Sequence, residues 1–179
     1  MELNPLTALS PIDGRYARQT DALRDIFSEC AFMNARVRVE VEWLISLSEA
    51  GFAELPHLSD HGKAFLRGLA DNFSLADCEA IKEIEKTTNH DVKAVEYWIK
   101  NQVAHDEELK SASEFVHFSC TSEDINNTSH AIMLKRGREA LADYLQQIHD
   151  TIAGFAHQWA EIPMLSRTHG QTASPTTVG

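Results

Sequence analysis

Apolar residues recur at intervals of three and four positions along most of the chain, and this period predicts helices rather than strands. The first helix is expected over residues 21–50, with an inward face of Leu23, Ile26, Cys30, Met33, Val37, Val41 and Leu44. Gly51 is expected to end it. Pairs of opposite charge four residues apart predict ion pairs on its exposed face, namely Arg36/Glu40 and Arg38/Glu42.

Later helices are marked by residues that cap helix ends. Hydroxyl residues at Ser59 and Ser74 are expected to precede the second and third helices, and the second resembles a capping box. A fourth helix restarts at Val92, with Thr88 or Asn89 as its expected cap. Residues 101–110 are interpreted as an acidic connector.

A long helix is predicted from Asp124 to about Ala160. Its apolar positions alternate between spacings of four and three, in the order Leu141, Leu145, Ile148, Ile152, Phe155 and Trp159. Such a helix would be about 55 Å long, so helices of other subunits, or of chain beyond Gly179, are expected to cover this seam. Pro163 is expected to end the helix, and a loop without strand alternation is expected after it.

Three polar stretches interrupt the helical pattern, and each contains a histidine. They are His117–Asn127, Thr87–Asp91 and Ser166–Gln171. The first has hydroxyl residues, then acids, then an amphipathic segment, which is typical of a helix N-terminus. Such an end presents free N–H groups and partial positive charge, so it can bind an anion. The alternative for the first stretch is an ordinary capped helix end, and the alternative for His90 and Asp91 is a solvated pair at a helix end.

Composition restricts the class of protein. The chain has 179 residues, a net charge of −11 and no apolar run that could span a membrane, so nucleic acid and membrane partners are not expected. Three widely spaced cysteines predict reduced thiols and a cytosolic setting. His57 and His61 lack the acidic neighbour of a zinc motif, so surface positions are expected and no metal site is predicted.

A turn near the N-terminus provides a further candidate site. Asp13-Gly14 favours a tight turn that presents Arg15 and Tyr16. A guanidinium can bind a phosphate through two hydrogen bonds, and the phenol adds a third group. The alternative is a solvated turn with a packed tyrosine.

These motifs together resemble the adenylosuccinate lyases of the fumarase/aspartase superfamily. The resemblance rests on residues 10–16, Ser-Pro-Ile-Asp-Gly-Arg-Tyr, on residues 87–97, which begin Thr-Thr-Asn-His-Asp-Val, and on residues 117–127 and 166–171. It implies an all-α fold with an N-terminal helical domain over 1–111. Residues 112–179 would form the incomplete start of a central helical bundle, with the chain as an N-terminal portion of a longer enzyme.

The resemblance also implies an activity and roles for individual residues. The reaction is a carbon–nitrogen lyase step that removes fumarate from adenylosuccinate to give AMP, and from a succinyl-carboxamide ribotide (SAICAR to AICAR) in purine biosynthesis. It uses no cofactor, in a cytoplasmic homotetramer. By resemblance His169 is the general acid, and His90 is catalytic beside it. Substrate-binding roles fall to Arg15, Tyr16, Asn89, His90, Asp91, His117, Thr121, Ser122 and Gln171.

The sequence departs from that family in ways that keep alternatives open. Thr172 and Ser174 replace residues that are often proline and threonine. No segment matches the family's loop with the catalytic serine, so the chain alone is expected to be inactive. The alternatives are a sister enzyme such as argininosuccinate lyase, whose substrate has no phosphate for Arg15 and Tyr16, and a helical assembly module without chemistry.

Overall fold

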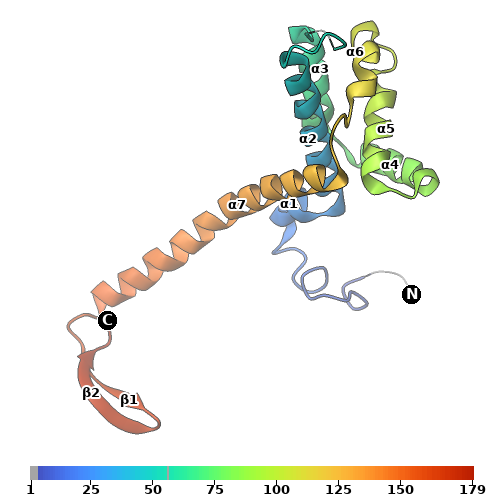
Figure 1. Ribbon diagram of the computed structural model, residues 1–179. Coiled ribbons are helices and arrows are strands. Elements are labelled where there is room, and N and C mark those ends of the chain that lie inside the picture. Colours follow the sequence, from blue (N-terminus) through green and yellow to red (C-terminus); the bar gives the residue numbers. More distant parts are fainter. Residues whose placement is uncertain (1–3, 56) are drawn as a thin grey trace. The chain divides into compact units, whose positions relative to one another are not determined.

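The computed structural model describes residues 4–55 and 57–179 and shows a mainly helical chain (Figure 1). It forms two compact units, one up to Gly137 and one from Arg138 to Gly179. The predicted all-α class is confirmed, apart from one short hairpin in the second unit. The predicted domain limits, 1–111 and 112–179, stay a prediction.

The helices follow the predicted order with some differences in their bounds. Their ranges are η1 Asp21–Leu23, α1 Arg24–Phe27, α2 Glu29–Glu49, α3 Asp60–Asp71, α4 Leu75–Thr88, α5 Asp91–Val103, α6 Glu107–Ala112, η2 Ser113–Phe115 and α7 Ser122–Gln158. The single helix expected over 21–50 is broken at Ser28. This residue is extended, and its side chain accepts a hydrogen bond from the N–H of Ala31, so it starts α2 afresh. The connector expected over 101–110 contains the end of α5 and most of α6, so that prediction was wrong.

Most helices begin at the capping residues that the sequence predicted. Ser59 accepts from Gly62 N–H at the start of α3, and Ser74 forms a capping box with Asp77 at the start of α4. The cap of α5 is His90, whereas Thr88 or Asn89 was expected. Asn89 instead ends α4 in the left-handed conformation, with φ 50°. The amide of asparagine tolerates this conformation better than most side chains.

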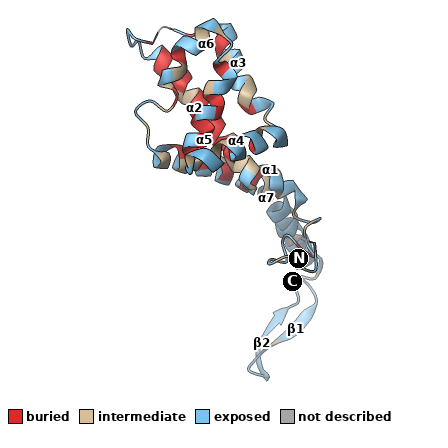
Figure 2. Cartoon of the chain, turned by 90° about the vertical axis from the view of Figure 1, so that its right-hand side faces the viewer, coloured by how far each residue is buried: buried red, intermediate tan, exposed pale blue. Residues whose placement is uncertain are grey.

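The core of the first unit is built around α2 and α5, where buried positions are densest (Figure 2). It includes Val37, Val41, Leu44, Val95, Ile99, Ile81, Leu66 and Leu109. Arg36 and Glu40 are buried with this core, at 5% and 0% exposure, so the expected exposed pair was wrong. Arg38 and Glu42 are partly exposed, and they bind Asp71 and Arg67 rather than each other.

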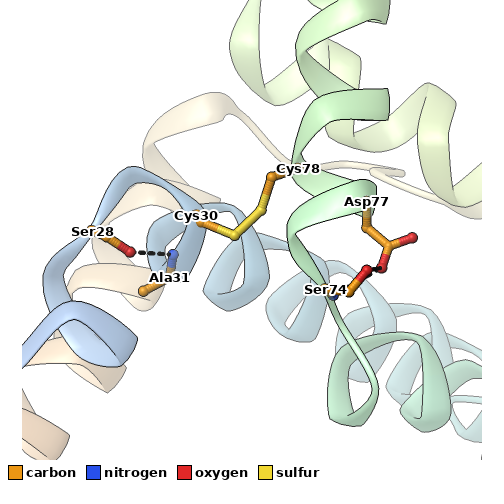
Figure 3. The surroundings of a disulfide bond; sticks show 6 residues. All are labelled: Ser28, Cys30, Ala31, Ser74, Asp77 and Cys78. Atoms are coloured by element: carbon orange, nitrogen blue, oxygen red, sulfur yellow. Dashed lines mark hydrogen bonds between the residues drawn. A yellow bond between two sulfur atoms is a disulfide. The ribbon is translucent and has the colours of Figure 1, made fainter. Parts of the chain in front are cut away.

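A disulfide joins the first turn of α2 to the first turn of α4 (Figure 3). Cys30 and Cys78 are 48 residues apart in sequence, and their Cα atoms are 5.7 Å apart, within the usual range for a disulfide. Cys120 is the free cysteine. The prediction that all three thiols are reduced was therefore wrong. An odd cysteine count concealed one pair whose partners only the tertiary packing brings together.

The second unit contains the rest of α7 and a two-stranded antiparallel hairpin. Strand β1 covers Pro163–Thr168 and β2 covers Gln171–Thr177, so the loop expected here was wrong. Both residues of the turn have positive φ, 49° for His169 and 73° for Gly170. This is the combination that a two-residue hairpin with the twist of its strands requires. The strands are exposed nearly throughout, so they lack the alternating buried face that marks a strand in sequence.

Helix α7 itself agrees closely with its predicted range. Its apolar seam is exposed, with Leu145 at 65% and Ile152 at 61%. Phe155 and Trp159 stack on each other with ring centroids 4.7 Å apart. Over residues 4–55 and 57–179, no helix combines the length and apolar character needed to cross a membrane.

Candidate functional site

The N-termini of α5 and α7 meet in the first unit. His90 caps α5, because its Nδ1 accepts the N–H of Lys93 at 3.1 Å. Its other nitrogen, Nε2, lies 3.4 Å from Oγ of Ser122, the first residue of α7. The cap fixes the tautomer in which Nε2 carries the proton. His90 therefore presents an N–H beside a serine hydroxyl and two helix ends of partial positive charge.

Arg36 of α2 holds these two helix ends in place. Its Nη2 lies 2.5 Å from Oδ2 of Asp91, and its Nε donates to Oδ1 of Asn126 at 2.9 Å. The guanidinium also stacks on the ring of Phe32, 3.9 Å from the centroid. One buried side chain thus joins the first turn of α5 to the first turns of α7.

The pKa of Asp91 follows from this contact. Partial burial would raise the pKa of the carboxyl. The charge of Arg36, together with hydrogen bonds from Val92 N–H and from the guanidinium, outweighs burial and lowers that pKa below its usual value. Asp91 is therefore ionised at neutral pH and serves to hold Arg36.

A cavity of about 360 Å³ opens beside these groups. Its lining combines three apolar side chains of α2 and α4 with the polar side chains of Glu29, Arg36, Glu85, Asn89, His90 and Asp91. We call it the His90 pocket. It is concave, half polar, and has a few convergent donors, as small-molecule sites commonly do.

His117 lies in the loop that leads into α7. Its Nδ1 is 2.5 Å from Oε1 of Glu40, a carboxylate in the middle of α2. Burial raises the pKa of Glu40, and the hydrogen bond from the His117 ring partly opposes that rise. Next along the loop, Trp43 Nε1 donates to the carbonyl of Phe118 at 2.8 Å.

Thr121 and Asp124 cap α7. The N–H and the hydroxyl of Thr121 both contact Oδ2 of Asp124, at 2.7 and 2.8 Å. These bonds, the backbone one first, lower the pKa of Asp124. The hydroxyl of Thr121 is thus engaged within the loop, whereas Ser122 directs its hydroxyl toward His90.

The remaining predicted site residues belong to the N-terminal turn and to the second unit. Arg15 and Tyr16 are exposed in the N-terminal turn, with the guanidinium 5.1 Å from the centroid of the Tyr16 ring. They are absent from the described lining of the His90 pocket. In the second unit His169 is the first residue of the hairpin turn and Gln171 is the first residue of β2, and both are exposed. The structure thus brings together Asn89, His90, Asp91 and Ser122, and places His117 and Thr121 in the loop before Ser122.

Sequence reasoning missed the residues of α2 that support the site. Arg36, Glu40 and Trp43 lie at spacings of four and three, on one side of the helix, and each contacts a site segment. Their signal was present, because charged residues interrupt an otherwise apolar face at Arg36 and Glu40. From the sequence alone, these two charges were interpreted as an ion pair between Arg36 and Glu40 on the exposed face of the helix. Metal binding has no comparable signal: within the described residues, no group of three or more His, Cys, Asp or Glu side chains is placed to hold an ion.

Solved structures with a similar arrangement of helices include a fumarate lyase and a muconate lactonizing enzyme. A fumarate lyase from Mesorhizobium matches 88% of this chain and 34% of its own, with TM-score 0.68 and 20% identity. A 3-carboxy-cis,cis-muconate lactonizing enzyme from Pseudomonas putida gives TM-score 0.67 at 21% identity, covering 88% of this chain and 34% of that one. At these identities the likeness defines the fold class.

Sequence comparison narrows this class to one family. A family model described as "Lyase" matches residues 14–179, and the chain belongs to that family. The chain is 53% identical to an adenylosuccinate lyase of Vibrio cholerae, 54% to that of Haemophilus influenzae and 52% to that of Escherichia coli. Each alignment covers all of this chain and 40% of the relative, so the chain spans less than half of their length. The resemblance predicted from the motifs is confirmed.

Proposed function

We propose that this chain supplies part of the active site of an adenylosuccinate lyase. The reaction removes fumarate from adenylosuccinate to give AMP, and from the analogous succinyl-carboxamide ribotide. The observation that carries the proposal is the contact of His90, which lines the His90 pocket, with Ser122 at the N-terminus of α7. Identities of 52–54% to relatives with that name support the choice of substrate.

The elimination requires three kinds of group. A base removes a proton from the carbon beside a succinyl carboxylate, donors stabilise the negative charge that develops, and an acid protonates the nitrogen as the carbon–nitrogen bond breaks. In this proposal His169 is the acid. Ser122, His90 and the N–H groups of the α7 end bind a succinyl carboxylate. No residue of this chain is assigned as the base.

The substrate is an anion. The first unit offers it the partial positive charge of helix N-termini rather than a surface rich in basic side chains. The net charge of the chain is −11, so long-range attraction does not favour binding. Local donors must provide the affinity, and helix N-termini with neutral side-chain donors are suited to this. In the proposal Arg15 and Tyr16 bind the nucleotide phosphate, and Asn89, Asp91, His117, Thr121 and Gln171 complete the substrate site.

The proposal extends to the assembly. The exposed seam of α7 supports a homotetramer in which helices of other subunits cover it, and purine synthesis is consistent with a cytoplasmic location. The elimination as proposed needs neither a metal nor an organic cofactor.

The proposal is tested by a chimera that joins this chain at Gly179 to the part of the Haemophilus influenzae relative that the chain does not cover. We expect release of fumarate from adenylosuccinate, followed as a fall in ultraviolet absorbance. His169→Ala in the chimera should reduce kcat by about 100-fold or more, since general acid catalysis contributes about that much. A folded chimera that leaves adenylosuccinate unchanged would contradict the proposal.

The phosphate role of Arg15 has a matched control in Arg18, an exposed arginine three residues further on. Arg15→Ala should raise KM for adenylosuccinate about tenfold or more, because a charged hydrogen bond is lost. Arg18→Ala should leave KM unchanged. Equal effects of the two substitutions would remove Arg15 from the phosphate site.

A further inference from the structure

Glu40 is a carboxylate in the core whose hydrogen bonding is confined to His117. It is fully buried, and Val37, Val41 and Leu44 of the same helix are buried with it. Oε1 lies 2.5 Å from Nδ1 of His117, while Oε2 has no hydrogen-bond partner in the described part of the chain. A buried acid with one free oxygen is costly to a fold, and an apolar residue would fill this position at lower cost. The stability of the core therefore does not explain why a carboxylate occupies position 40.

The loop that contains His117 is strained. His117 and Ser119 have φ values of 64° and 59°, in the left-handed region that side chains other than glycine rarely adopt. Two residues of α2 hold this conformation from one side, Glu40 through the His117 ring and Trp43 through the carbonyl of Phe118. Strained backbone of this kind persists where surrounding contacts determine it, and it is often found at functional sites.

The geometry divides the roles of the two ring nitrogens. Nδ1 faces Glu40, and an ionised carboxylate can only accept a hydrogen bond, so Nδ1 carries the proton when Glu40 is ionised. Nε2, on the opposite edge of the ring, is then the nitrogen that remains for a ligand. The side chain of His117 is 19% exposed, so the ring is held but not enclosed. Glu96, the other acid whose charge acts on Glu40, is itself paired with Lys93 and Lys100.

We propose that Glu40 is a positioning residue, which fixes the ring of His117 in the orientation and tautomer that reserve Nε2 for the substrate. The part of this inference that concerns substrate rests on the proposed function. The part that concerns the proton does not, because the contact lies within the first unit. Glu40 acts through His117 and does not itself touch a ligand.

Nitrogen-15 NMR of the chain labelled at histidine tests the proton assignment directly. The signals of His117 are those lost in His117→Asn, a substitution that the left-handed backbone tolerates. We expect Nδ1 of His117 to be protonated in the parent chain. In Glu40→Leu, which fills the core with an apolar side chain, the ring should shift toward the Nε2–H form that an imidazole without a partner favours. A parent chain with Nδ1 unprotonated would overturn the proposal, whatever the variants do.

Glu42→Gln is the matched control, because Glu42 lies two residues further along α2 in an exposed pair with Arg67. It should leave the His117 signals unchanged. In the chimera described above, Glu40→Leu should lower kcat at least tenfold, and Glu40→Gln, which keeps an acceptor, should restore part of the loss. Unchanged kcat in Glu40→Leu would refute the catalytic half of the inference. An inactive parent chimera would refute the proposed function. The NMR result would then still decide which ring nitrogen of His117 carries the proton.

Discussion

Arg36 shows how one buried side chain determines the geometry of a site. It contacts Asp91 and Asn126, two residues that lie 35 positions apart in sequence, near the N-termini of α5 and α7. Its own side chain is 6% exposed, whereas that of Asp91 is 49% exposed. Water therefore screens one partner of the pair, so the pair is weaker than a fully buried one.

Replacing Arg36 by Met should lower the free energy of unfolding by about 2 kcal/mol, because Asp91 and Asn126 lose their shared donor. Since the folded pKa of Asp91 is lowered, the ionic part of this difference is present above the unfolded pKa of about 4. It is lost as the pH falls through the folded pKa. Urea unfolding at pH 7 and at pH 3 measures both effects.

Arg38→Met is the control for that substitution, since Arg38 binds Asp71 on the surface. An exposed pair is worth less than about 1 kcal/mol. If both variants lost the same stability, with the same dependence on pH, Arg36 would have no special role in joining the helices.

At the scale of elements, the sequence predicted most helix starts because caps are local. Ser59 and Ser74 need only their own next three residues to form a cap, and both were found. His90 was missed as a cap because two better cap types, Thr88 and Asn89, stand directly before it. The pair Arg36 and Glu40 was misplaced because helical spacing cannot tell an exposed ion pair from two buried charges with distant partners. Those partners, Asp91 and His117, are 55 and 77 residues away.

The β1–β2 hairpin was missed for a related reason. A strand is recognised in sequence when one of its faces is buried, and neither strand here buries a face within the chain. The local signal lay in the turn, where His169-Gly170 adopts two positive φ values. The site residues that share one loop or one helix end were predicted together, whereas the supporting side chains of α2 were not.

Substitutions at two glycines of the second unit test how much backbone conformation contributes to the stability of the hairpin turn and of α7. A Cβ would meet no atom within 4 Å at Gly170 or at Gly154, so backbone conformation alone decides the outcome. Gly170→Ala forces a left-handed alanine and should weaken the hairpin by about 1 kcal/mol. Gly154→Ala lies within α7 and should strengthen the helix by about 1 kcal/mol.

Amide hydrogen exchange measures the two effects separately, in β1–β2 and in α7. Faster exchange of the hairpin in Gly170→Ala and slower exchange of α7 in Gly154→Ala are expected. Unchanged exchange in the hairpin of Gly170→Ala would show that the turn does not require its positive φ.

For the whole molecule, the disulfide is the largest departure from what composition predicted. Thiol titration of the denatured chain should find one reactive cysteine before reduction and three after it. Replacing Cys30 and Cys78 together by Ser should lower the free energy of unfolding by about 2–4 kcal/mol, because the bond closes a loop of 48 residues. Cys120→Ser is the control and should leave stability nearly unchanged. Three reactive thiols before reduction would restore the original prediction of a fully reduced chain.

Helix α2 has a mechanical consequence for the whole site. One rod carries the groups that grip the start of α5, the start of α7 and the loop between His117 and Ser119. A movement of α2 along its axis would therefore displace all three segments together. A molecule bound to any one of these segments would thus be coupled to the other two through α2, in addition to the direct contact between His90 and Ser122.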